Sequence, residues 1–477
     1  SYGLSRSGHF QEGYALGEDC SRFFEERSNP QQIALICASQ CYASMMVGNY
    51  TEAKACGKHG YELSGQHGYH WEMLASAFNL GYVHFLAGEY DQAKSIYERI
   101  LEKAEKVGSP PSMTAFACNN LGEILHALDD DRAAKPLFEK AYALFQEINN
   151  KYGMAFSLNN IGNVAHAAAD YQTAQRYNQR ALDLYREIGD RRGTADALNR
   201  MGGVAFSMGE YMQTKPYHDE ALTIYRAMGD KRGMANSLIM LANAPNAFGD
   251  HALALRYIGE SLALRRELGN PLEIADALWF MSLNTALNNG TFEESIGFLD
   301  EADMLLEQAG SFEPRLTAFR AIVHLLYGRY AEAKSLFAAL IPDVERINLP
   351  WILLQVSAGM GSALYGLGQY DEAKPYLQQS IEIGLRIKTL DWAMLGASAA
   401  AALIGREGRI FDAVTWLAFI SDDIHTIAFI RRQAHQYLAE LLTKLSPQDY
   451  AAAVEHSKTL DTNTVIEQVL AALQART

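Results

Sequence analysis

The sequence predicts an all-α fold, an α-solenoid of about eleven to twelve stacked helical hairpins that ends in a C-terminal capping helix. Three observations predict it: a turn motif that returns about every forty residues, apolar residues at helical spacing around each turn, and capping signals between hairpins. With 49% hydrophobic and 20% charged residues, the 477-residue chain suits a folded protein rather than a disordered or membrane-embedded one.

The turn motif is the strongest of these signals. Pieces such as GNYTEA, GEYDQA, ADYQTA and GQYDEA end on a small residue, and successive small residues are 38 to 41 positions apart. The series runs through Gly13, Ala53, Ala93, Ala134, Ala174, Thr214, Ala254, Ser295, Ala333, Ala373 and Ala413. A more divergent copy, QDYAAA, places Ala453 forty residues further on.

Each unit is predicted to form two helices, as the segment SLNNIGNVAHAAADYQTAQRYNQRALDLYREIGD at residues 157–190 illustrates. Its apolar residues share one face of each helix, because they recur at spacings of three, four and seven positions. They are Leu158, Ile161, Ala165 and Ala168 in the first helix, and Ala174, Tyr177, Ala181 and Leu184 in the second. The linker EIGDRRG supplies a glycine that ends one helix and an aspartate that caps the next. A single hairpin cannot bury both of its apolar edges, so the hairpins must stack.

These motifs resemble the tetratricopeptide repeat. The resemblance rests on Leu-Gly in the first helix (NNLGEI at residues 119–124), Gly-x-Tyr at the turn, and two later alanines seven positions apart. The forty-residue unit with NNxG, GDRRG and GDKRG is similar to the longer-helix subclass of kinesin light chains, Pins/LGN adaptors and the sensor regions of bacterial STAND-type regulators. The resemblance covers essentially the whole chain and implies a right-handed superhelix.

The two ends differ from the regular repeat. Residues 1–27 are expected to be a partial N-terminal repeat, because Gly8 and Phe10 already belong to a turn, and we expect a segment upstream of Ser1 to complete it. Tandem hairpins are expected over residues 28–422, and a divergent last repeat with capping helices over residues 423–477. Ser446 with Pro447, and Thr464 with Glu467 as a capping box, are predicted to start the final two helices. This closing segment resembles that of bacterial multidomain regulators that carry an NTPase ahead of such repeats.

The middle of the chain departs from the pattern at LANAPNAFGD. Pro245 lies well inside the expected helix, where a proline favours a bend. Residues 245–333 then form either a hinge or a stretch of repeat decay, and the sequence leaves both open. Trp279, Trp351 and Trp392 are expected in the core.

Composition limits the compartment and the partners. A total of 41 basic and 56 acidic residues gives a net charge of −15, which argues against a general nucleic-acid surface. The five cysteines form no CxxC pair and are odd in number, which indicates buried thiols in a reducing compartment. No apolar run approaches the length of about 20 residues that spans a bilayer, so no membrane contact is expected and the cytoplasm is the default location.

Motifs for catalysis are missing from this sequence. It contains no phosphate loop, no HExxH and no GxSxG, and its thirteen histidines form no pair of ligands at i and i+4. GMGSALYGLG lies in an expected helix that no strand precedes, so it does not indicate a nucleotide site. We therefore expect a non-catalytic chain without cofactor or metal, and any NTPase chemistry would lie upstream.

A polar stripe on the first helix of each hairpin is the candidate binding surface. Asparagine is a mediocre helix former, yet Asn159 and Asn163 share a face with His166. The family resemblance implies that this face lines a concave groove, where amides pair with the backbone of a peptide. The candidate residues are Asn119, Glu123, His126, Asn159, Asn163, His166, Asn199, Arg200 and Asn243. The alternative is that such amides, Asn120 and Asn160 above all, bridge neighbouring helices.

The sequence thus favours a ligand-sensing region of a bacterial STAND-type signalling or transcriptional regulator. We expect it to bind a peptide or a protein in its groove, and to oligomerise, if at all, through upstream domains. The alternatives are a stand-alone peptide-binding adaptor, a small-molecule sensor and an assembly scaffold.

Overall fold

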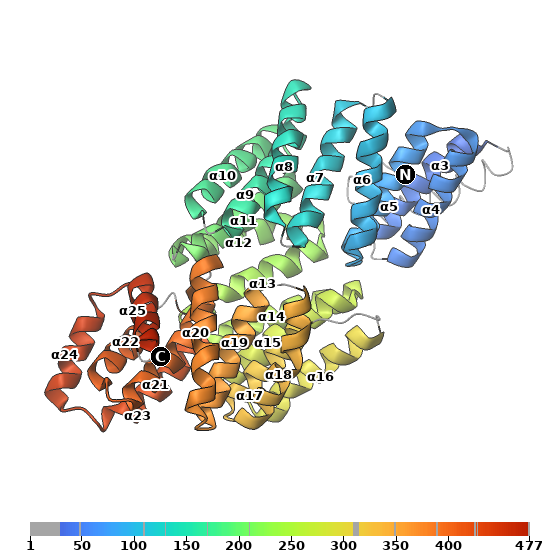
Figure 1. Cartoon of the computed structure of the whole chain (residues 1–477). Helices are drawn as coiled ribbons and strands as arrows, with labels where there is room; N and C mark the ends of the chain where they lie inside the picture. Colours follow the sequence, from blue (N-terminus) through green and yellow to red (C-terminus); the bar gives the residue numbers. More distant parts are fainter. Residues whose placement is uncertain are drawn as a thin grey trace. The chain divides into compact units, whose positions relative to one another are not determined.

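The computed structural model describes residues 29–475, except 47–48, 108–109, 129, 169, 209, 309–313, 348–349, 388–389, 424–425 and 427. The expected partial repeat at residues 1–27 lies outside the described residues. The described part of the chain contains 23 helices, α3 to α25, and no strand (Figure 1). The all-α prediction is confirmed.

Twenty of these helices form ten hairpins, each with a first helix (A) and a second helix (B). The hairpins are α3 (Pro30–Met46) with α4 (Tyr50–His67), α5 (His70–Leu86) with α6 (Tyr90–Val107), α7 (Pro111–Ala127) with α8 (Asp131–Glu147), α9 (Lys151–Ala167) with α10 (Tyr171–Ile188), α11 (Arg191–Ser207) with α12 (Tyr211–Met228), α13 (Lys231–Ala247) with α14 (His251–Leu268), α15 (Pro271–Leu287) with α16 (Phe292–Gln308), α17 (Pro314–Leu326) with α18 (Tyr330–Ile347), α19 (Pro350–Gly366) with α20 (Tyr370–Ile387), and α21 (Leu390–Arg406) with α22 (Ile410–Asp422). Three further helices follow, α23 (Ala428–Leu442), α24 (Pro447–Ser457) and α25 (Thr462–Gln474).

The linkers between hairpins work as the sequence predicts. Gly189 ends α10 with φ = 70°, a left-handed conformation that glycine adopts without strain. Asp190 caps α11, because its Oδ1 accepts a hydrogen bond of 2.9 Å from the backbone N–H of Gly193. Asp230 caps α13 through the equivalent bond to Gly233 at 3.0 Å. The GDRRG and GDKRG segments therefore stop one helix and start the next.

Glycines let the A and B helices approach each other. The rings of Phe145, Tyr185 and Tyr225 lie over glycines of the following A helix, the second of them over Gly193. A Cβ atom added to Gly193 would lie 2.3 Å from Tyr185 Cδ1, which is closer than any real contact. This contact joins one hairpin to the next, because the ring belongs to the B helix of the preceding hairpin.

The chain divides into two compact units. Unit 1 comprises residues 1–237 and 267–269, and unit 2 comprises residues 238–266 and 270–477. The division falls within α13, ahead of Pro245. This helix continues to Ala247, so Pro245 occupies its last turn and the helix is not broken there. In unit 1, each A helix from α3 to α9 also contacts the A helix of the next hairpin, which makes the A helices the inner layer.

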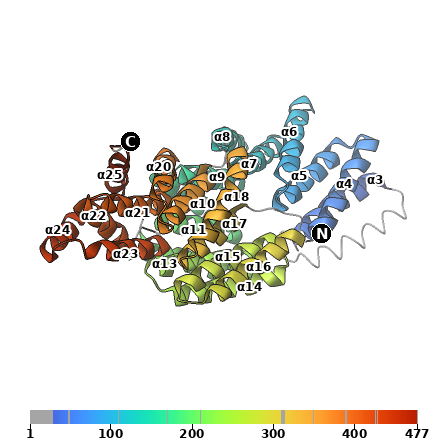
Figure 2. The ribbon, with the colours of Figure 1, turned by 60° about the horizontal axis from the view of Figure 1, so that its bottom comes forward.

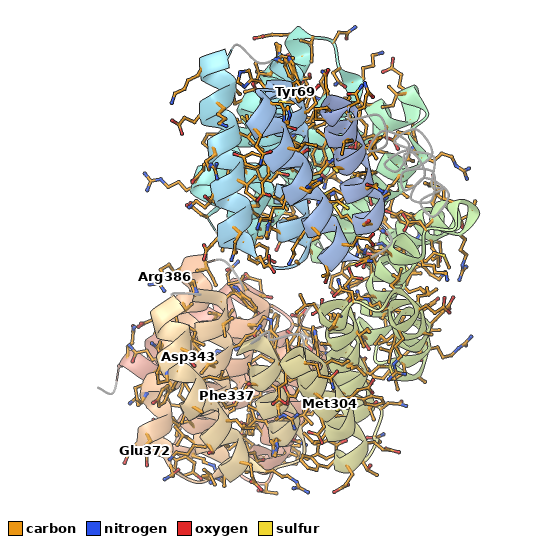
Figure 3. The ribbon with its side chains drawn as sticks, turned by 90° about the vertical axis from the view of Figure 1, so that its right-hand side faces the viewer. Tyr69, Met304, Phe337, Asp343, Glu372 and Arg386 are labelled. Atoms are coloured by element: carbon orange, nitrogen blue, oxygen red, sulfur yellow. The ribbon has the colours of Figure 1, made fainter. Side chains whose placement is uncertain are left out.

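The C-terminal end of unit 2 covers its last hairpin on two sides. Helix α23 packs on one side of α21 and α22, while α24 packs on α22 and α25 on α21 from the other (Figures 1 and 2). The indole N–H of Trp416 donates a hydrogen bond of 2.8 Å to Gln468 and joins α22 to α25. Figure 3 shows Phe337 inside unit 2, with Glu372 and Arg386 at its edge. Trp279, Trp351 and Trp392 are half-buried and pack against the core, as expected.

The start of the last helix differs from the prediction. Ser446 caps α24, as expected, by accepting a bond of 3.1 Å from the Asp449 N–H. The N-cap of α25 is Asp461 rather than Thr464, so the helix begins at Thr462. The Asp461 carboxylate accepts bonds from both the backbone N–H (2.9 Å) and the hydroxyl of Thr464. Asp461 therefore fulfils the capping role that the sequence pattern assigned to Thr464.

Four of the five cysteines lie among the described residues. Cys37, Cys41 and Cys118 are buried, and burial raises the pKa of Cys41 to about 12. Cys56 is half-buried, and Cys20 lies outside the described residues. No described helix has the length and apolarity needed to cross a bilayer. Nor do the described residues bring together three or more His, Cys, Asp or Glu side chains that could hold a metal ion.

Two substitutions in α11 test the contact between ring and glycine. Gly193→Ala should lower the free energy of unfolding by about 1–3 kcal/mol, because the new methyl group must displace the buried Tyr185 ring. Gly203→Ala in the same helix has open space around its Cβ and should raise it by about 0.5–1 kcal/mol. Chemical denaturation measures both. Equal effects of the two substitutions would contradict this role of Gly193.

Candidate ligand-binding site

Polar and charged side chains of successive A helices meet on the inner layer of unit 1. Tyr42 (α3), Tyr82 (α5) and Glu123 (α7) are 40 and 41 residues apart, so they occupy the same place in three consecutive A helices. We call these residues, together with Asn160 (α9) and Arg192, Asp196 and Arg200 (α11), the inner cluster. Because the repeat brings its members together from five A helices, the cluster depends on stacking and not on any one hairpin.

Electrostatic interactions show that these side chains are neighbours. Glu123 interacts with Arg200 and Asp196, which lie two hairpins further along the chain. Tyr82 interacts with Tyr42, Glu123 and Arg192. The hydroxyl of Tyr50 accepts a bond of 2.7 Å from Arg232, so the start of α13 meets the start of α4. Unit 1 thus closes on itself next to the cluster.

Glu123 is the central acid of the inner cluster. Burial raises the pKa of its carboxyl to about 7, while Arg200, Asn160 and His126 favour the charged form and limit the rise. Among the described residues, the buried Oε2 of Glu123 makes no hydrogen bond of regular geometry, while a hydrogen-bond interaction with the Asn160 amide lowers the pKa of the carboxyl. The carboxylate therefore keeps acceptor capacity that the described residues do not fill.

The wall of the inner cluster that α11 forms carries both signs of charge. Tyr225 donates a hydrogen bond from its hydroxyl to Asp196, and Arg192 lies 3.4 Å from the Asp230 carboxylate. The Asp196 side chain is reached by solvent, yet the surrounding protein desolvates it and raises its pKa. Nε of Arg200 is buried without a hydrogen-bond partner. This wall therefore presents a donor from Arg200 as well as acidic acceptors.

Two of the asparagines predicted as binding residues make bonds between hairpins. Nδ2 of Asn119 donates to Ser157 Oγ at 2.9 Å, and Nδ2 of Asn199 donates to Ser237 Oγ at 2.9 Å. Asn119 and Asn159 are both buried, at 0% and 3% exposure. At Asn159 the corresponding neighbour is Ala197, and Oδ1 of Asn159 has no partner. Two of these amides thus hold neighbouring A helices together, as the structural alternative predicts.

The remaining predicted residues lie at varied places. His126 bonds Asp131 through Nδ1, and His166 bonds Ser207 through Nε2 at 2.8 Å, so both rings have partners within the protein. Burial lowers the pKa of His166. Asn163 is half-buried at the place in the repeat that Glu123 occupies one hairpin earlier. Asn243 is half-buried in the part of α13 that belongs to unit 2.

The bridging role expected of Asn120 is visible, and it explains the state of Asn160. Nδ2 of Asn120 donates to the Tyr97 hydroxyl at 2.7 Å, and that hydroxyl donates to the Phe78 carbonyl at 2.8 Å. In the next hairpin the place of Tyr97 is taken by Phe138, which has no hydroxyl. Nδ2 of Asn160 therefore lacks the hydroxyl partner that Asn120 has, and the Asn160 amide instead lies within hydrogen-bonding reach of the Glu123 carboxyl.

Comparison with known proteins identifies the repeat. A tetratricopeptide repeat model matches residues 72–147, 113–187 and 193–267, and a second model of this repeat matches residues 355–383. Tetratricopeptide repeats thus account for residues 72–187, 193–267 and 355–383. No curated protein sequence matches it.

Solved structures show the same tetratricopeptide architecture. A Rap protein complexed with competence and sporulation factor has a TM-score of 0.57 at 13% identity, covering 76% of this chain and 99% of that one. The apo form of RapI has a TM-score of 0.50 at 13% identity, covering 75% and 98%. A STAND protein with a tetratricopeptide repeat sensor from Pyrococcus horikoshii has a TM-score of 0.47 at 16% identity, covering 71% and 55%. At these identities the likeness shows the fold alone, and the third score is too low to support any argument.

The polar stripe identified Glu123 and Arg200, but sequence reasoning missed Tyr42, Tyr82 and Asp196. The signal for the two tyrosines was present, because both lie a whole number of tetratricopeptide repeats before Glu123. Asp196 stands one helical turn before Asn199, so its inward position depends on the face that α11 turns to its neighbours.

The pH dependence of stability tests the burial of Glu123. Its folded-state pKa of about 7 lies above the ordinary value of 4.5, so the folded state binds the proton more tightly. Ionisation therefore destabilises the fold progressively from about pH 4.5 to pH 7. Glu123→Gln should raise the free energy of unfolding by about 1–3 kcal/mol at pH 8 and change it little at pH 4. Denaturation at both pH values measures this, with the exposed Glu139→Gln in α8 as control. A gain independent of pH would show that Glu123 is not desolvated.

Proposed function

We propose that the inner cluster of unit 1 binds an extended peptide segment, as the sensing step of a STAND-type signalling protein that works in the cytoplasm. The observation that supports this most directly is a set of three buried polar atoms that make no hydrogen bond of regular geometry with the described residues. They are Glu123 Oε2, Asn160 Nδ2 and Arg200 Nε, which come from three consecutive A helices. Leaving a buried polar atom unpaired costs about 1–3 kcal/mol, so a ligand that pairs with all three gains that stabilisation.

The chemistry of the three atoms suits a peptide backbone. Each peptide unit offers one N–H donor and one C=O acceptor. Glu123 would accept from a backbone N–H, while Asn160 and Arg200 would donate to carbonyl oxygens. Tyr42 and Tyr82 add aromatic surface beside these groups, which favours contact with apolar side chains. Recognition through the backbone leaves the side chains of the ligand to provide specificity.

The signalling role rests on the sequence resemblance to STAND sensor regions. The Rap protein with the same fold was solved with competence and sporulation factor bound, so this architecture can hold such a ligand. The odd number of cysteines and the absence of a CxxC pair are in keeping with a reducing compartment. A ligand that binds one arrangement of the stacked hairpins better than another would shift the population toward it, and an attached effector would respond to that shift.

Peptides selected from a randomised library on the full chain provide the test. Glu123→Gln and Arg200→Gln should each weaken the binding of a selected peptide about 10- to 100-fold, because charge-assisted hydrogen bonds contribute about 1.5–3 kcal/mol. Glu139→Gln and Arg180→Gln remove the same charges from exposed positions on B helices and should leave the affinity unchanged. Titration calorimetry measures all four. Peptides whose affinity depends on neither Glu123 nor Arg200 would place the binding site elsewhere.

Two asparagine variants distinguish a role in ligand binding from a role in stability. Asn163 occupies the place in the repeat that Glu123 has one hairpin earlier. Asn163→Ala should therefore weaken peptide binding by about 0.5–1.5 kcal/mol and leave the melting temperature unchanged. Asn119→Ala removes the bond to Ser157 and should lower the melting temperature. Thermal melts and titrations on the same samples measure both quantities. Loss of stability in both variants without loss of affinity would show that Asn119 and Asn163 are both structural.

A further inference from the structure

The hairpin contact between α4 and α5 lacks the aromatic ring found in later hairpins. Ser64 of α4 occupies the place of Phe145, Tyr185 and Tyr225, the rings that lie over glycines. Glu72 of α5 stands where those glycines would be, while Met73 follows it and lines the contact. Gly60 replaces Ile100, the residue at its place in the following B helix. The α4 side of the contact between these hairpins is therefore filled by much smaller groups.

A pocket of about 330 Å³ lies between α4, α5 and α6. Its lining is mainly apolar, with Met73, Leu74 and Leu80 from α5, Ile96 and Ile100 from α6, and Tyr61 from α4. A second hollow of about 440 Å³ adjoins it and extends past Ser64 to Gly68 and His70. Tyr69, labelled in Figure 3, marks this turn at the end of unit 1. The volume falls in the range of about 300–1,000 Å³ that is common for small-molecule sites.

Basic side chains surround the mouth of this α4–α6 pocket. Lys58 is 3.9 Å from Glu62, but among the described residues neither Arg99 nor Lys103 forms an ion pair with a carboxylate. Arg99 donates to the Tyr61 hydroxyl at 2.8 Å, and Nζ of Lys103 lies 3.5 Å from Met73 Sδ. Both cations also face the Tyr61 ring, at 5.8 Å and 5.9 Å from its centre. Two cations thus stand at an apolar opening in a chain whose net charge is −15.

We propose that the α4–α6 pocket binds an amphiphile with one unbranched hydrocarbon chain and a carboxylate head, the chemistry of a medium-chain fatty acid. The apolar lining removes the hydrocarbon chain from water. The carboxylate remains at the mouth, where Arg99 offers its planar fork of donors and Lys103 a mobile ammonium group. The site is separate from the inner cluster and does not depend on the function proposed for it.

The geometry favours a single-chain anion over other apolar ligands. A neutral alcohol would fill the same space and accept a hydrogen bond at the mouth but would lack the charge attraction to both cations, and a cationic amphiphile would be repelled there. The hydroxyl of Tyr61 accepts from Arg99 and keeps its own O–H, so the donors at the mouth are one hydroxyl and two charged groups. Discrimination by head group is therefore the distinctive property of this site.

Titration of the full chain with dodecanoate, below its micelle concentration, tests the proposal. The double substitution Arg99→Gln with Lys103→Gln should weaken the binding of dodecanoate at least tenfold. It should leave the binding of dodecanol unchanged. Ile96→Trp should abolish the binding of both, and later hairpins tolerate a ring there, because Tyr177, Tyr217 and Tyr257 hold the same place.

A matched control is present two hairpins later. Arg180 donates to the Tyr142 hydroxyl at 3.1 Å, which repeats the Arg99–Tyr61 pair beside a contact that Phe145 fills. Arg176→Gln with Arg180→Gln should therefore leave the affinity for dodecanoate unchanged. Thermal melts confirm that each variant is folded. Dodecanoate that binds no tighter than dodecanol, or that binds equally well to the Ile96→Trp variant, would overturn the proposal.

Discussion

The contact between a B-helix side chain and an A-helix glycine is the constraint on which the stacking of unit 1 depends. The rings of Phe145 and Tyr185 lie so close to Gly153 and Gly193 that a Cβ atom there would be 2.3 Å away. Within a hairpin, Gly122 faces Phe138 in the same manner. These contacts fix the separation of the helices, and the inner layer follows from them. Residues about one repeat apart, such as Asn119 and Ser157, consequently become neighbours across hairpins.

The two proposed binding sites lie where single residues depart from the pattern of the repeats. Tyr97 holds Asn120 through its hydroxyl, and the change to Phe138 in the next hairpin frees Asn160 to lie beside Glu123. A similar change, from a ring to Ser64, accompanies the pocket between α4 and α6. Repeats supply a regular frame in which the loss of one group leaves a polar atom or a cavity exposed to a ligand. Departures from local consistency are expected at functional places for this reason.

The sequence was sufficient to predict the hairpins, because their signals are local. A glycine and an aspartate such as Gly189 and Asp190 act within a few residues of each other, and their effect does not depend on the rest of the fold. The candidate site was predictable only in part. Glu123 and Arg200 belong to a readable polar stripe, but their interaction spans two hairpins and depends on the curvature of the stack. The serine partners of Asn119 and Asn199 lie 38 residues away, beyond any helical period, so their structural role could not be predicted from spacing within a helix.

Helix α5 links the two proposed sites physically. Tyr82 faces the inner cluster from this helix, while Met73, Leu74 and Leu80 line the pocket between α4 and α6. A ligand in the pocket influences the inner cluster only to the extent that α5 takes different positions with and without it. If α5 moves, thermodynamic linkage requires the effect to be reciprocal, so that a peptide at Glu123 changes the affinity of the pocket by the same factor. If α5 stays fixed by its glycine contact, in which a Cβ on Gly81 would meet Tyr97 at 2.9 Å, the two sites act independently. The rigidity of one helix contact thus decides whether the two proposed sites act separately or are coupled.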